Sequence, residues 1–94
     1  MKATIDSKRY DTETAILIAD DRYWDGHNWE RRGKNKYLYK TKKGNYFVMV
    51  TTLWAGERDY LESLSKETAK RCFENLPEHE VEWEVAFGES PEKA

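Results

Sequence analysis

The sequence has few of the residues that build cross-links, metal sites or membrane spans. Its 94 residues include one cysteine, which excludes an internal disulfide and a cysteine-based zinc site. No apolar run approaches the roughly 18 residues that a transmembrane helix needs. Acidic Asp6 follows the start of the chain before an apolar stretch of signal-peptide length can form. These absences predict a soluble, cytoplasmic protein.

The chain also lacks linkers, internal repeats and low-complexity segments. Both of its prolines come late, at Pro77 and Pro91. Hydrophobic residues make up 38% of the chain, which is enough for one modest core. We therefore expect a single domain over residues 1–88, followed by a flexible C-terminal tail over residues 89–94.

Charge is strongly segregated along the chain, although the formal net charge is only −2. Residues 31–56 carry seven basic and no acidic side chains, whereas residues 57–94 carry eleven acidic and five basic ones. Such asymmetry steers a charged partner. The alternative is that the acidic and basic elements lie side by side in the fold and neutralise each other.

The residue patterns predict an α+β fold, with a small, mainly antiparallel sheet of three to five strands and two helices. Residues 37–41 and 46–52 are rich in β-formers and flank a turn with Gly44, which predicts a hairpin. The second of these strands is apolar on both faces, as in a covered central strand. Ser65 is a good helix N-cap and precedes an amphipathic stripe, so a helix is expected over residues 66–75. Shorter strands are expected in two places: residues 3–5 and residues 59–63.

Two segments are ambiguous. Asp11 and Thr12 are good N-caps, which favours a helix over residues 13–20, although the apolar run there also suits a buried strand. In that helix Tyr10 would pack against Ile16 as a hydrophobic staple. Residues 80–87 place Val81, Trp83, Val85 and Phe87 at positions that alternate with Glu80, Glu82, Glu84 and Ala86, which predicts a half-buried strand. A short final helix is the alternative, because glutamate disfavours strands. The expected core comprises Ile16, Leu38, Phe47, Val48, Val50, Ala69, Phe73, Leu76, Val81 and Trp83.

The candidate catalytic and metal-binding residues form no recognisable set, so we predict no catalytic residue, metal or cofactor. His27 lies near Asp25, but no nucleophile accompanies it. Cys72 falls on the apolar stripe of the expected helix, as an inert core cysteine does. The acids and histidine of the 20–30 segment match neither an EF-hand nor a zinc pattern: Asp20, Asp21, Asp25, His27 and Glu30.

Four segments resemble a group of small proteins from phages and conjugative elements of Firmicutes. Residues 8–15 match the opening Lys-x-Tyr-Asp-Thr-x-Thr-Ala, and residues 38–47 match a Leu-Tyr-x-x-x-x-Gly-x-Tyr-Phe hairpin. Residues 64–69 match a Leu-Ser-x-Glu-x-Ala helix start, and Phe87 with Gly88 match a late Phe-Gly. Similar segments occur among anti-CRISPR proteins. The resemblance implies a protein of a mobile genetic element, in the cytoplasm of a bacterial host, that inhibits a defence protein such as a CRISPR nuclease by direct binding.

Two groups of residues suit a protein partner. Trp, Tyr and Arg dominate interface hot spots, because each buries a large area and keeps a polar end. In the expected strand over 80–87, glutamates at alternate positions form a carboxylate row that can occupy a groove built for phosphate. The partner-binding candidates are Tyr23, Trp24, Trp29, Arg31, Arg32, Glu80, Glu82 and Glu84. Trp54 is a further aromatic candidate.

The alternative function is nucleic-acid binding by the basic, aromatic hairpin over residues 31–47. Lysines neutralise phosphates, and aromatic faces stack on unpaired bases. The nucleic-acid candidates are Lys36, Tyr37, Tyr39, Lys40, Lys42 and Lys43. The residue patterns leave the oligomeric state and the identity of the partner open.

Overall fold

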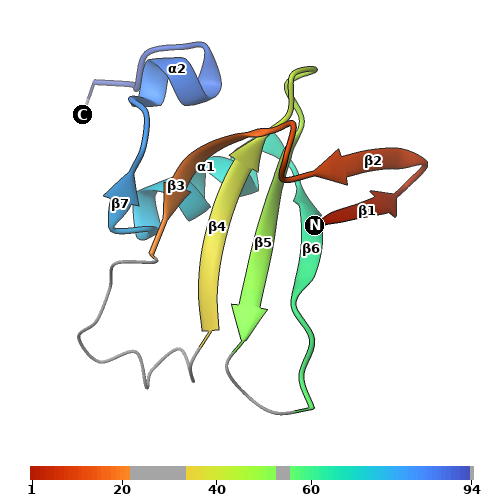
Figure 1. Ribbon diagram of the computed structural model, residues 1–94. Helices are drawn as coiled ribbons and strands as arrows, with labels where there is room; N and C mark the ends of the chain where they lie inside the picture. The colour runs from red at the N-terminus through yellow and green to blue at the C-terminus, as the bar shows by residue number, and fades with distance from the viewer. Residues whose placement is uncertain (22–33, 53–55, 94) are drawn as a thin grey trace.

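The computed structural model describes residues 1–21, 34–52 and 56–93. Along the chain the elements are β1 (Lys2–Ile5), β2 (Lys8–Asp11), β3 (Ile16–Asp20), β4 (Lys34–Lys40), β5 (Tyr46–Thr52), β6 (Tyr60–Leu64), α1 (Lys66–Asn75), β7 (Glu78–His79) and α2 (Trp83–Phe87). The fold is α+β, as the sequence predicts (Figure 1).

The centre of the structure is a five-stranded sheet in the order β6-β5-β4-β3-β7, and every neighbouring pair in it is antiparallel. Strands β3 to β6 follow one another in space as they do in sequence. The β1–β2 pair forms a separate two-stranded sheet beside them (Figure 1). The hairpin of β4 and β5 and the strand β6 confirm the expected strands in these regions.

Strand β5 is covered on both faces, as its apolar sequence predicts. On one face Val48 and Val50 join the core beneath α1, together with Leu38 of the neighbouring strand. Phe47 points to the opposite face, where the rings of Tyr10 and Tyr39 lie 5.3 and 5.1 Å from its ring. The β1–β2 sheet thus covers Phe47 with the side chain of Tyr10.

Helix α1 begins where the sequence predicts. The Ser65 hydroxyl oxygen accepts a hydrogen bond from the Thr68 amide at 3.2 Å, which satisfies one of the free amide groups of the first turn. Ala69 and Phe73 are buried against the sheet, and Pro77 follows the end of the helix. The expected amphipathic stripe therefore does face the core.

The predicted helix over residues 13–20 is wrong, because this segment continues as strand β3. The Asp11 carboxylate does accept a hydrogen bond from the Glu13 amide at 2.9 Å, but the turn it closes ends by Ala15. The apolar run then pairs with β4 and buries Ile18. Ile16 is 52% exposed, so neither its core position nor its staple with Tyr10 is found.

The predicted strand over residues 80–87 is also wrong, and the alternative of a short final helix is correct. The strand β7 before this segment covers only two residues, which pair with β3, and the chain then turns into α2. The Tyr46 hydroxyl donates a hydrogen bond to the Ala86 carbonyl oxygen at 2.8 Å, which ties α2 to the sheet. Phe87 is buried, whereas Val81 and Trp83 are half-buried at the border of the core.

Candidate functional site

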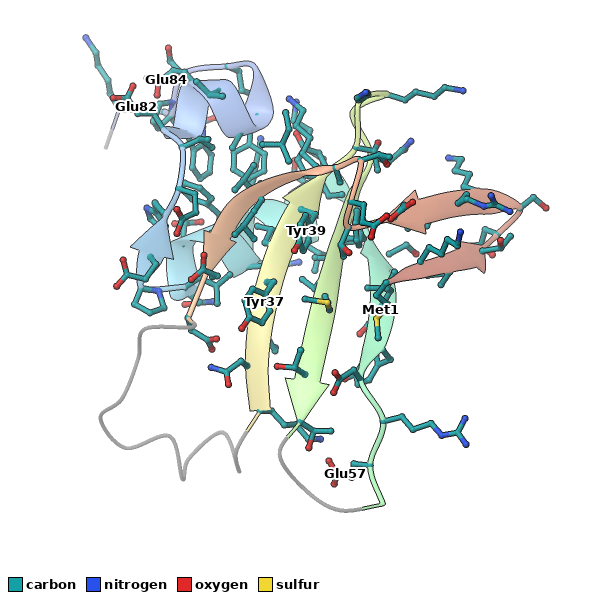
Figure 2. All side chains as sticks on the ribbon, in the orientation of Figure 1. Met1, Tyr37, Tyr39, Glu57, Glu82 and Glu84 are labelled. Carbon is teal, nitrogen blue, oxygen red and sulfur yellow. The ribbon has the colours of Figure 1, made fainter. Side chains whose placement is uncertain are left out.

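The predicted basic, aromatic hairpin does not present its residues on one surface. Successive side chains of a strand point to opposite faces, so Lys36 and Lys40 share the face that carries α1, whereas Tyr37 and Tyr39 lie on the other (Figure 2). The Lys40 ammonium donates a hydrogen bond to the Val85 carbonyl oxygen at 3.4 Å. The hairpin therefore divides the predicted nucleic-acid site into separate parts.

Lys42 and Lys43 instead lie in a groove with two cations from β2. This groove has a volume of about 430 Å³ and receives Lys8 and Arg9 from the start of β2. The described residues that line it include no carboxylate. Its lining comprises Ser7, Lys8, Arg9, Tyr10, Thr14, Thr41, Lys42, Lys43 and Asn45. We call it the basic groove.

Local backbone geometry positions the basic groove. Asp6 and Ser7 adopt φ values of 51° and 64°, which reverse the chain between β1 and β2. Gly44 has a φ of 88° in the turn between β4 and β5, where a side chain would strain the backbone. The two turns bring Lys8 and Lys43, which are far apart in sequence, to the same groove. The sequence did not predict Lys8 and Arg9 as site residues. They directly precede Tyr10, which is buried on the same strand.

Glu80, Glu82 and Glu84 do come together, although not as a row on a strand. They line a hollow of about 440 Å³ between the end of α1 and the start of α2. Phe73 and Trp83 contribute aromatic surface to it, with their ring centres 5.8 Å apart. Figure 2 shows Glu82 and Glu84 on the outer side of the α2 region. We call this feature the acidic hollow.

The acidic hollow also contains His79, whose position is fixed by Phe73. The His79 Nε2 atom lies 2.7 Å from the Phe73 carbonyl oxygen, and the two rings stack with their centres 3.9 Å apart. The imidazole therefore caps the last turn of α1 and forms one wall of the hollow. This arrangement gives His79 a structural task that the sequence did not indicate.

The basic and acidic blocks come into contact at the start of β4. Within the described part of the chain, an ion pair joins them at Lys34 and Glu57, whose charged atoms are 3.7 Å apart. The remaining ion pairs there lie within the C-terminal block, where Lys66 and Lys70 meet Glu89. The basic groove and the acidic hollow are distinct surfaces: the described residues that line the groove include no Asp or Glu, and those that line the hollow include no Lys or Arg.

Several candidates lie outside the described residues. They are the partner-binding candidates Tyr23, Trp24, Trp29, Arg31 and Arg32, together with Asp25, His27, Glu30 and Trp54. Asp21 does lie within the structure and is buried. Its carboxylate accepts hydrogen bonds from the Lys36 amide at 2.9 Å and the Asn35 side chain at 3.1 Å, which ties the end of β3 to β4.

Glu89, at the start of the predicted tail, carries a pH dependence. A hydrogen bond from Lys70, with the nearby charge of Lys66, holds the pKa of this carboxyl below 4.5. A carboxyl with a depressed pKa stabilises the fold above its unfolded pKa, and that contribution disappears as the pH falls through the folded value. We therefore expect the stability difference between the wild type and Glu89→Gln to shrink as the pH drops below about 4.5.

Urea unfolding at a series of pH values measures this difference, and side-chain NMR titration gives the pKa of Glu89 directly. Because the Glu89 carboxylate is exposed to solvent, the effect on stability is small. A Glu89 pKa at or above 4.5 would contradict the prediction.

The described residues contain neither a cluster of metal ligands nor a helix that could cross a membrane. Residues 1–21, 34–52 and 56–93 contain no group of three or more His, Cys, Asp or Glu side chains placed to hold a metal ion. In the same ranges no helix has the length and apolar character needed to cross a membrane.

Comparisons with protein-family models, curated proteins and solved structures find no match to this chain.

Proposed function

We propose that this protein is a non-enzymatic binding protein of a mobile genetic element, and that it inhibits a bacterial defence protein, a CRISPR nuclease, by direct contact. The resemblance of residues 8–15 and 38–47 to proteins of phages and conjugative elements supports the origin. The observation that carries the mode of binding is the acidic hollow, where Glu80, Glu82 and Glu84 surround aromatic surface.

The acidic hollow has the chemistry to occupy a site that a nuclease uses for nucleic acid. Carboxylates take the place of phosphates toward the lysines and arginines of such a groove. The Trp83 ring adds aromatic surface beside the carboxylates of the hollow. A partner's cation would thus meet carboxylates and an aromatic ring together, which favours arginine over lysine.

The test compares two triple variants in a bacterial host that restricts phage through a CRISPR nuclease. Glu80→Gln, Glu82→Gln and Glu84→Gln remove the charge of the hollow while keeping the shape of the side chains. Glu13→Gln, Glu62→Gln and Glu92→Gln make the same charge change at exposed positions elsewhere. We expect wild type and control to restore phage growth, and the hollow variant to lose this effect together with nuclease pull-down.

Either of two results would contradict the proposal. Restriction that is unchanged by the wild-type protein across hosts with different CRISPR nucleases would remove the inhibitor function. Equal inhibition by the wild type and the hollow variant would keep that function but exclude the acidic hollow as its contact surface.

A second candidate function is nucleic-acid binding, and the basic groove favours it. Lys8, Arg9, Lys42 and Lys43 converge there without an opposing carboxylate among the described lining residues. Four cations in one groove can neutralise the phosphates of a nucleic-acid backbone.

For this function we expect Lys42→Glu with Lys43→Glu to abolish binding of single-stranded DNA in a fluorescence anisotropy assay. Lys2→Glu with Lys93→Glu is the control, since both lysines are exposed and line neither surface. Four phosphate contacts predict that the logarithm of affinity falls with the logarithm of salt concentration with a slope of about −3. Binding that does not respond to salt, or that survives the charge reversal, would exclude the groove.

A further inference from the structure

A third concave feature lies between α1 and the sheet, and neither proposed function uses it. This cleft has a volume of about 550 Å³, within the range of roughly 300–1,000 Å³ typical of small-molecule sites. Strands β4, β5 and β6 form one wall, and successive turns of α1 form the other. Its lining comprises Lys34, Lys36, Val50, Tyr60, Thr68, Arg71, Cys72, Asn75 and Leu76.

The mouth of the cleft is cationic. Lys34 and Lys36 come from alternate positions of β4, so both point to the α1 side, and Arg71 faces them from the helix. Lys34 also pairs with Glu57 at 3.7 Å, whereas the described residues that line the cleft include no carboxylate. Like charges gathered in this way repel one another, and an anion bound between them relieves the repulsion.

The interior of the cleft is apolar, with a few polar groups at its edge. Val50 and Leu76 are buried and form the floor, and half-buried Cys72 lies beside them. Burial raises the pKa of the Cys72 thiol, and the charge of Lys36 opposes this shift, which places the two side chains in one electrostatic environment. The ring of Tyr60 is 46% exposed and provides an aromatic surface, while Thr68 and Asn75 supply hydrogen-bonding groups.

We propose that this cleft binds a small organic phosphate of about mononucleotide size, with its phosphate between Lys36 and Arg71 and its ring against Tyr60 and the apolar floor. A guanidinium with a neighbouring ammonium matches the charge and geometry of a phosphate dianion. The cleft is larger than a phosphate ion alone requires, and its floor suits a flat, weakly polar ring. Both walls thus contribute to the site: β4 and α1 supply the charge, and β6 supplies the stacking surface.

The single cysteine of the chain provides a direct reporter, because Cys72 lines the cleft. The rate of its alkylation by N-ethylmaleimide is measured with AMP, with adenosine and with inorganic phosphate, and each titration is followed by amide NMR. We expect AMP to slow alkylation and to shift the amides of Lys36, Val50 and Tyr60. Adenosine and inorganic phosphate should each slow alkylation less than AMP does. Adenosine lacks the phosphate that the cations bind, and inorganic phosphate lacks the ring that packs on Tyr60.

Charge-reversal variants locate the binding. Lys36→Glu and Arg71→Glu change exposed side chains and should each weaken AMP binding by about tenfold or more. Lys43→Glu, in the basic groove, makes the same charge change and should leave AMP binding intact. Arg71→Gln serves as a second, milder variant of the helix wall.

Three results would overturn the proposal. They are unchanged Cys72 alkylation at millimolar AMP, equal protection by adenosine and AMP, and equal weakening by Lys43→Glu and Lys36→Glu. The last result would show general charge attraction rather than a site. The inhibition assay described above does not depend on this cleft, so the two proposals fail independently.

Discussion

Replacing Phe47 by alanine is expected to lower the free energy of unfolding by about 3–5 kcal/mol. Phe47 is fully buried in the interior strand β5 and packs against the rings of Tyr10 and Tyr39. Its loss removes the contact through which the β1–β2 sheet covers the main sheet. A folded domain is stable by only about 5–15 kcal/mol in total, so the variant should lose a large share of its stability.

Urea unfolding followed by circular dichroism measures this effect. Ile16→Ala is the matched control, because Ile16 also lies on a strand of the main sheet but is 52% exposed. We expect the control to change stability by less than about 0.5 kcal/mol. Similar losses in the two variants would mean that Phe47 is not the anchor of the β1–β2 sheet.

The second large effect is expected from Phe87→Ala, which should release α2 from the core. Phe87 is buried, and its ring contacts those of Tyr46, Phe73 and Trp83 at 4.6–5.5 Å between ring centres. Loss of this side chain should destabilise the docked helix by about 3 kcal/mol. Because α2 helps to form the acidic hollow, the variant should also lose the inhibitory activity proposed above.

Amide hydrogen exchange separates local release from global unfolding. In Phe87→Ala we expect faster exchange at the hydrogen-bonded amides of Ala86 and Gly88, while strand β5 stays protected. Val85→Ala is the matched control on the same helix, since Val85 is 60% exposed and should contribute little. Equal protection of α2 in both variants would show that the Phe87 ring does not hold the helix in place.

The elements predicted correctly are those whose signals are local and agree with one another. Strands β4 and β5 combine β-forming residues with a turn at Gly44, and helix α1 combines the Ser65 cap with an apolar stripe. The helix predicted after Asp11 is wrong because the Asp11 cap closes a single turn and the apolar run that follows pairs with β4. That pairing depends on residues distant in sequence, which a cap does not reveal.

The strand predicted over residues 80–87 is wrong for a different reason. Val81, Trp83, Val85 and Phe87 occupy alternate positions, but a helix places Trp83 and Phe87 on the same side, one turn apart. Exposure of Val85 shows that the helical spacing prevails. Sequence could therefore supply the glutamates of the acidic hollow but not its shape. The basic groove and the cleft between α1 and the sheet form from segments that are distant in sequence. The sequence could therefore predict only some of the residues in each.

The order of the strands has a consequence for how the molecule folds. Strands β3 to β6 each pair with their neighbour in sequence, so their contacts are local along the chain and the meander should form rapidly. Strand β7 instead returns to β3 from the far end of the chain and adds a two-residue pairing. We therefore expect β7 and α2 to dock last, as the chain closes its longest loop. The acidic hollow would then be completed only in the final step of folding, and it would be the first part of the molecule to open under stress.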